Sequence, residues 1–163
     1  MNIIDLRKEI IFFREKLNSL SNEDFSWYHT KVLQFEDKKN YPLDFQIFME
    51  EIGTVYASCE FNEGYTILNL ELPRAVVKSD FVNPHLFDAD SLDRIEINGI
   101  SVPTHNIRLI ATDVDMQFYG FNTSKNPYEF FSMWGVDWAG ESTVGISFWS
   151  WFKKHMSDSI EYL

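Results

Sequence analysis

The sequence has a single cysteine, Cys59, among its 163 residues. One cysteine cannot form an internal disulfide, and a chain without a disulfide framework is typical of a reducing compartment. The first residues, Met1 to Arg7, contain no basic segment followed by an apolar run, so no secretory signal is expected there. No apolar stretch approaches the ~20 residues that span a bilayer. These features predict a cytoplasmic protein with no membrane partner.

The sequence also lacks the common motifs of catalysis. It contains no Gly-x-x-x-x-Gly-Lys or Gly-x-Gly-x-x-Gly phosphate loop and no Gly-x-Ser-x-Gly nucleophile turn. The four histidines are scattered without metal-ligand spacing: His29, His85, His105 and His155. Cys59 paired with a histidine would make a nucleophile, but its place in an expected strand favours a buried, inert thiol. We therefore expect no enzyme, no cofactor and no metal.

Basic residues are scarce in the later part of the chain. Residues 1–50 carry 7 basic and 9 acidic side chains, whereas residues 51–163 carry 7 and 16. Between Leu109 and Phe152 the only basic residue is Lys125, against Asp113, Asp115, Glu129, Asp137 and Glu141. Such a segment repels nucleic acid and anionic membranes, and it attracts a basic partner. The alternative is that the net charge of −11 serves solubility alone.

Apolar residues make up 45% of the chain and aromatic residues 17%. A chain of this length is most simply one domain, residues 1–163, and its aromatic side chains can fill a dense core without disulfides.

Three helices are expected before residue 54. Ile3, Leu6, Ile10, Phe13 and Leu17 recur at steps of three and four residues, which predicts one apolar helix face. Ser21 followed by Asp24 resembles a capping box, so a second helix is expected over residues 25–35.

The third helix is expected to start near Pro42, whose fixed φ suits a first turn. Its apolar stripe consists of Phe45, Phe48, Met49 and Ile52, and Gly53 can close it in the left-handed conformation.

The period then changes to that of strands. Residues 54–61 and 65–72 flank Asn62-Glu63-Gly64, a hairpin pattern. Further strands are expected over residues 94–97, 108–112, 117–121 and 128–134, and Ser147 is expected to cap a last helix. The order predicts an α+β fold in which N-terminal helices pack on a mainly antiparallel β-sheet, closed by a C-terminal helix.

Two patterns supply candidate binding residues. Asp113 and Asp115 flank one residue, which is compatible with a divalent ion but is more typical of turn carboxylates. Four of the five tryptophans follow: Trp134, Trp138, Trp149 and Trp151. Trp149 and Trp151 lie about 200° apart on a helix, so they cannot both face the core. A loop tryptophan among carboxylates suits a protein-binding hot spot, although folding back onto the core is an equal alternative. The candidate partner-binding residues are Asp113, Asp115, Trp134, Asp137, Trp138 and Glu141.

Two segments resemble the SUKH superfamily, the fungal cell-wall-assembly-regulator type of domain. The first is Pro42, Phe45, Phe48, Met49 and Gly53, similar to the family's proline–aromatic helix closed by glycine. The second consists of the segment 119–122, the proline-initiated strand 127–131 and the closing aromatic helix around residues 148–152.

The resemblance implies an α+β fold without catalytic residues or cofactors. Many bacterial members are immunity proteins of polymorphic toxin systems, so the implied partner is a cognate toxin domain. A basic nuclease toxin would explain the acidic later part of this chain. Two alternatives remain: a non-catalytic scaffold or regulator, and a metal-dependent enzyme that uses Asp113 and Asp115. The oligomeric state does not follow from the sequence.

Overall fold

The computed structural model describes residues 2–21, 24–59, 65–77, 80, 93–112, 117–134 and 142–160. The chain forms two compact units, residues 1–72 with 147–163 and residues 73–146. It combines helices with antiparallel strands, so the predicted α+β class is confirmed. Strand β3 (Tyr65–Ala75) begins in the first unit and ends in the second. The expectation of a single domain over residues 1–163 stays a prediction.

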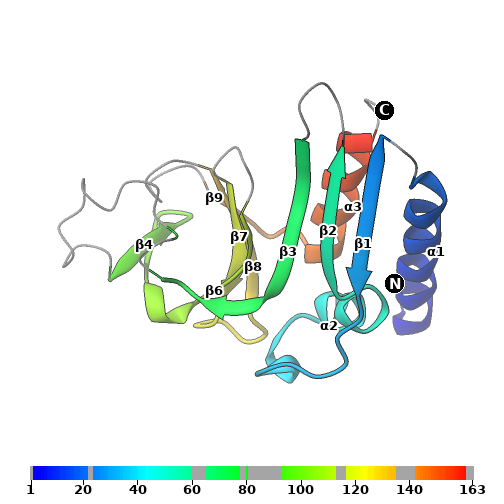
Figure 1. Ribbon diagram of the computed structural model, residues 1–163. Helices are drawn as coiled ribbons and strands as arrows, with labels where there is room; N and C mark the ends of the chain where they lie inside the picture. The colour runs from blue at the N-terminus through cyan, green and yellow to red at the C-terminus, as the bar shows by residue number, and fades with distance from the viewer. Residues whose placement is uncertain are drawn as a thin grey trace. The chain divides into compact units, whose positions relative to one another are not determined.

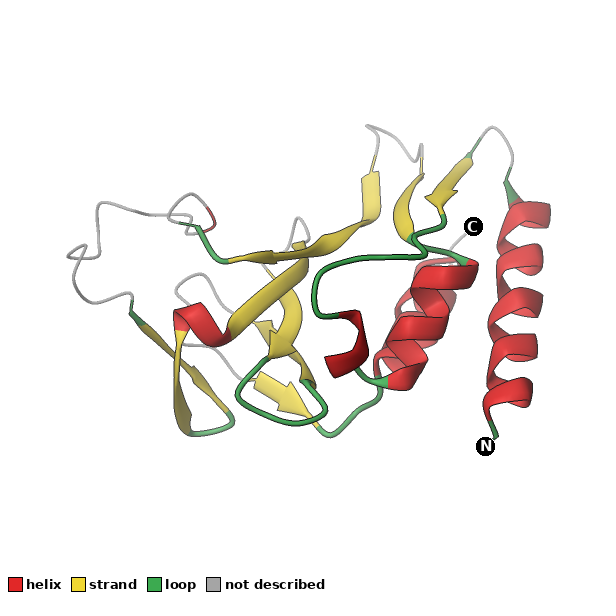
Figure 2. Ribbon diagram, turned by 90° about the horizontal axis from the view of Figure 1, so that it is seen from below, coloured by secondary structure: helices red, strands yellow, loops and turns green. Residues whose placement is uncertain are grey.

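The first unit contains the three α-helices of the described residues. Its elements are α1 (Ile3–Leu20), β1 (Phe25–Thr30), α2 (Leu43–Glu51), β2 (Thr54–Cys59), most of β3 and α3 (Phe148–Ile160), with a short 3-10 helix at Lys38–Asn40. Strand β2 pairs antiparallel with β1 on one side and with β3 on the other. The helices lie on one side of these three strands (Figures 1 and 2). The C-terminal helix therefore packs on the strands, as expected.

Helix α1 forms as its apolar spacing predicts. The Asn2 side chain caps it by accepting a hydrogen bond from the backbone N–H of Asp5 at 2.9 Å. Leu6, Ile10 and Leu17 are buried. The Phe13 ring meets the Trp149 ring edge-on, with 5.5 Å between the ring centroids. These contacts join the first helix of the chain to the last.

Helix α2 begins at Leu43, directly after Pro42, and its Phe45, Phe48 and Met49 side chains are buried. Gly53 has φ +89°, which confirms the predicted left-handed stop. The site also excludes side chains: a Cβ at Gly53 would lie 1.8 Å from the Thr30 carbonyl oxygen. Glycine is required here both for its backbone conformation and for the close passage of β1.

The helix expected over residues 25–35 is wrong, because Phe25–Thr30 form strand β1. Phe25 and Trp27 are buried while Tyr28 is exposed, which is the alternation of a strand with one covered side. The Ser21 hydroxyl donates to the Phe25 carbonyl instead of capping a helix. Aromatic and β-branched residues suit such a strand, and pairing with β2 outweighs the local cap signal.

Helix α3 receives two caps at its N-terminus. The Ser147 hydroxyl accepts from the backbone N–H of Ser150 at 3.2 Å, which confirms the predicted cap. The Asp44 carboxylate of α2 accepts from the backbone N–H of Trp149 at 2.9 Å. A carboxylate at a helix N-terminus also complements the helix dipole. Trp149 is buried and Trp151 only half-buried, as their angular separation requires.

The second unit is built from strands. They are β4 (Arg94–Ile97), β5 (Ile100–Pro103), β6 (Ile107–Thr112), β7 (Gln117–Asn122), β8 (Glu129–Trp134) and β9 (Ser142–Val144), with a 3-10 helix at Thr104–Asn106. Strands β6 to β9 pair antiparallel in sequence order, and β4 pairs with β5. The predicted strands β4, β6, β7 and β8 are confirmed, whereas β5 and β9 were not predicted.

The second unit has its own core, made mostly of aliphatic side chains. Its buried members are Ile95, Ile97, Val102, Ile107, Leu109, Phe118, Phe131 and Met133. Asn122, at the end of β7, is buried too, and its side-chain oxygen accepts from the Ser124 backbone N–H and hydroxyl. This Asx turn satisfies a buried polar group while it ends the strand.

Candidate protein-binding surface

The three strands of the first unit have an uncovered side that carries two exposed tyrosines. On β1, Tyr28 is 66% exposed, and directly opposite it on β2, Tyr56 is 43% exposed. Residues that alternate with them, such as Trp27 and Val55, are buried on the helix side. The strand period of two therefore divides each strand into a core side and an open side.

The open side continues onto β3. Asn69 lies opposite Tyr56 in the register, and both Asn69 and Glu71 are exposed. The Asn69 amide donates to the Glu71 carboxylate at 3.4 Å, so these two side chains lie together on the surface. We define the tyrosine surface as Tyr28, Thr30, Thr54, Tyr56, Asn69 and Glu71; an open hollow of about 400 Å³ lies over it.

Charge on the tyrosine surface has one sign. Among the described residues that line the hollow, Glu71 is the only acidic one, and none of them is a lysine or arginine. Exposed tyrosines offer large apolar area with a polar tip and few rotatable bonds, and they are enriched in protein-binding hot spots. The arrangement suits contact with a protein better than enclosure of a small molecule, because the hollow is open.

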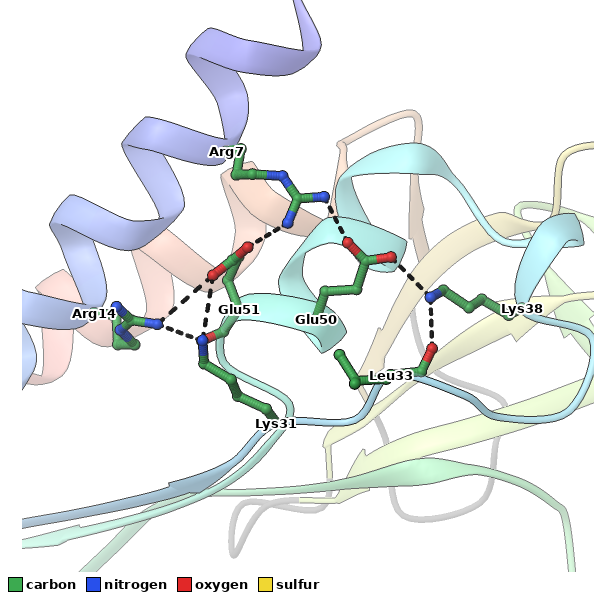
Figure 3. Close-up of polar contacts among 7 residues, drawn as sticks. All are labelled: Arg7, Arg14, Lys31, Leu33, Lys38, Glu50 and Glu51. Carbon is green, nitrogen blue, oxygen red and sulfur yellow. Dashed lines mark hydrogen bonds and ion pairs between the residues drawn. The ribbon is translucent and has the colours of Figure 1, made fainter.

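An ionic network holds the end of β1 against α2. Four cations, Arg7, Arg14, Lys31 and Lys38, surround the adjacent carboxylates of Glu50 and Glu51 (Figure 3). Arg7 bonds both carboxylates, with 2.5 Å between its Nη2 and Oε2 of Glu50. Lys31, the residue after β1, lies 3.4 Å from the Glu51 carboxylate.

The cations of this network also bond backbone carbonyls near the C-terminus of α2. Arg14 donates to the Glu51 carbonyl at 2.8 Å, and Lys38 donates to the Leu33 carbonyl at 2.6 Å. The hydrogen bond from Lys38, supported by Arg7, lowers the pKa of Glu50 below its usual value. The network ties α1, α2 and the segment after β1 together, so we assign it a positioning role for the tyrosine surface.

His29 lies next to Tyr28 in β1 and is also among the residues that line the hollow. Its Nδ1–H donates to the Ile52 carbonyl at 3.2 Å, and its ring lies 5.5 Å from that of Trp27. Burial lowers the pKa of His29, so the ring is neutral at pH 7. The histidine adds no positive charge to the tyrosine surface.

Cys59 ends β2 and is 5% exposed, which confirms the expected burial. Burial raises the pKa of its thiol, and this keeps the sulfur in the unreactive protonated form. Among the described residues, no three His, Cys, Asp or Glu side chains gather closely enough to hold a metal ion. In that same part of the chain, no helix has the length and apolar character needed to cross a membrane.

The binding residues expected from the sequence are mostly not placed. Asp113, Asp115, Asp137, Trp138 and Glu141 lie outside the described residues. Trp134 ends β8, where its backbone lies opposite Gln117, but its side chain is not described. The structure therefore does not test whether these residues lie together, and the acidic, tryptophan-rich segment stays a prediction.

The sequence interpretation missed the tyrosine surface because it assigned residues 25–35 to a helix. The segment Phe25-Ser26-Trp27-Tyr28-His29-Thr30 is rich in the aromatic residues that strands favour, but this local preference does not show which strand it pairs with.

Comparison with known proteins gives no match to a family model, a curated protein or a solved structure. The function is therefore argued from the chain's own surface and from the sequence resemblance described above.

Proposed function

We propose that this chain is a protein-binding domain that acts in the cytoplasm as an immunity protein, by binding and neutralising a toxin domain of a bacterial polymorphic toxin system. One observation carries the binding role: two exposed tyrosines stand opposite each other on the open side of the strands, and the described residues that line the hollow there include no lysine or arginine. The immunity role is what the SUKH resemblance implies.

The charge of the chain supports a basic partner. A net charge of −11 speeds encounter with a cationic protein and disfavours nucleic acid. An inhibitor of a basic nuclease would cover the cationic site that otherwise holds the nucleic acid. A scaffold or regulator of a cellular enzyme is the second candidate, because an exposed tyrosine pair suits any protein partner equally well.

Co-expression with a candidate toxin domain, sought in the genes next to this chain's gene, tests the proposal. An immunity protein forms a stoichiometric complex with that domain, abolishes its activity in a purified assay and protects cells that produce it. Binding to a cellular enzyme without neutralisation of any toxin would favour the scaffold. Stoichiometric Mn²⁺ or Mg²⁺ binding that disappears in an Asp113→Asn, Asp115→Asn variant would favour the metal-dependent enzyme.

The acidic, tryptophan-rich segment has a separate test with the same toxin domain. Asp137→Asn is expected to slow association, most clearly at low salt, because rim charges act on encounter. Trp138→Ala is expected to speed dissociation, costing about 2 kcal/mol if this tryptophan is a hot spot. A lower melting temperature with unchanged affinity would instead identify Trp138 as a core residue.

A further inference from the structure

The tyrosine surface combines two aromatic side chains with one carboxylate, and both kinds of group attract cations. Tyr28 and Tyr56 are direct cross-strand partners, a geometry that places Cβ atoms about 5 Å apart. Both rings thus share one small area of the surface.

The carboxylate of Glu71 is held on the same side. Asn69 is the register partner of Tyr56, and Glu71 follows two residues later, which is one strand repeat. The Asn69 amide donates to Glu71 Oε1 and restricts where the carboxylate points. A group that contacts the Tyr56 ring therefore has a carboxylate within reach.

We propose that the tyrosine surface receives an arginine side chain of a basic protein partner, which packs against the Tyr28 and Tyr56 rings and pairs with Glu71. This inference rests on the proposed protein-binding function and names the partner's chemistry. Cations are attracted to the faces of aromatic rings, and arginine is the commoner partner. A planar guanidinium can stack on a ring and pair with a carboxylate at the same time.

Other ligands fit the surface less well. A phosphate or nucleic acid would meet the carboxylate of Glu71, and like charges repel. A lysine ammonium would attract the rings but lacks the flat guanidinium that stacks and pairs simultaneously. Thr30 and Thr54 are register partners across β1 and β2, and their hydroxyls can bond the backbone beside the bound arginine.

The surface is preorganised for such a contact. Beneath it, Trp27, Val55 and Leu70 are at most 6% exposed and are packed on the helix side. At one end, Lys31 is paired with Glu51, so a cation next to Thr30 is already engaged within the first unit. Rigid support reduces the ordering cost of binding.

The test uses peptides and needs no knowledge of the natural partner. The probe is the pentapeptide acetyl-Gly-Gly-Arg-Gly-Gly-amide, and its control replaces arginine by citrulline, which keeps the shape and removes the charge. NMR titration of the full chain follows the Asn69 side-chain amide and the tyrosine ring signals. We expect the arginine peptide to bind at least about tenfold tighter than the citrulline peptide.

Variants of the full chain then locate the site. Tyr28→Ala, Tyr56→Ala and Glu71→Gln should each weaken the arginine peptide by about three- to tenfold, whereas Tyr56→Phe should retain most of the binding. Phe12→Ala is the matched control, because Phe12 is an aromatic residue on α1 that is 70% exposed. Equal affinity for the two peptides, or wild-type binding by a Tyr28→Ala, Tyr56→Ala variant, would overturn the inference.

The peptide result and the toxin result are independent. Selective arginine binding without protection from a toxin would support the inference and reject the immunity role. Protection that survives in the double tyrosine variant would support the immunity role and reject this surface as the toxin site.

Discussion

The two sides of the strands β1, β2 and β3 differ in what their side chains do. On the helix side, Phe25, Trp27 and Val55 are buried against an aromatic core. On the open side, Tyr28 and Tyr56 face solvent. Adjacent residues of one strand are thus divided between the core and the proposed binding surface, because a strand directs successive side chains to opposite sides. We therefore expect that side chains on the open side can be changed without loss of the fold.

Phe48→Ala should give the largest effect and marks the stability side of the comparison. Phe48 is fully buried, and its ring centroid lies 4.6 Å from that of Phe152 and 4.8 Å from that of Phe148. We expect the free energy of unfolding to fall by about 3–5 kcal/mol, measured by urea denaturation. Tyr56→Ala is the control and should change stability by no more than about 0.5 kcal/mol. Similar losses for both variants would show that the open side is packed.

Gly53→Ala should destabilise the chain by about 2 kcal/mol or more. A Cβ at φ +89° is strained, and it would also collide with the Thr30 carbonyl oxygen 1.8 Å away. Gly99→Ala is a matched control: φ there is +72°, but no atom lies within 4 Å of the added Cβ. That control should cost only about 1 kcal/mol. If both variants melt at the same temperature, the close passage of β1 has no energetic weight.

Helix α2 and strand β1 show which parts of the fold could be predicted from sequence. Helix α2 was predicted correctly because its start, apolar stripe and glycine stop are local signals, and Gly53 confirms the last of them. Strand β1 was not predicted correctly, because its conformation depends on pairing with β2. Strand β2 follows β1 by more than 20 residues. Strand β9 is only three residues long, and β5 lacks the strict alternation of exposed and buried residues that β4, of the same length, shows.

The candidate surface was missed for the same physical reason. Tyr28 and Tyr56 are about 28 residues apart in sequence and become neighbours only through the register of β1 and β2. The composition did indicate a basic partner, since charge needs no fold to be counted. It could not indicate which side chains would contact that partner.

Acid should weaken the helix side through Glu50. Hydrogen bonds from Lys38 and Arg7 lower the pKa of Glu50, so its stabilisation is present above the usual glutamate pKa and is lost as pH falls through the lowered value. Between pH 6 and pH 3 the melting temperature should therefore fall less steeply for Glu50→Gln than for the wild type. At pH 6 the free energy of unfolding of Glu50→Gln should be about 1 kcal/mol lower than that of the wild type. Parallel curves for Glu50→Gln and wild type would show that the network contributes nothing.

The most direct test of the separation between the two sides is the dissociation constant of the proposed complex with a toxin domain. It is measured for the Tyr28→Ala, Tyr56→Ala variant together with the urea unfolding midpoint of that variant. Loss of both tyrosines should weaken the complex by about a hundredfold, since each is expected to act as a hot spot of about 1.4 kcal/mol or more. The unfolding midpoint should stay at the wild-type value. Wild-type affinity in this variant, or a large loss of stability, would contradict the assignment of the open side to binding and the helix side to the fold.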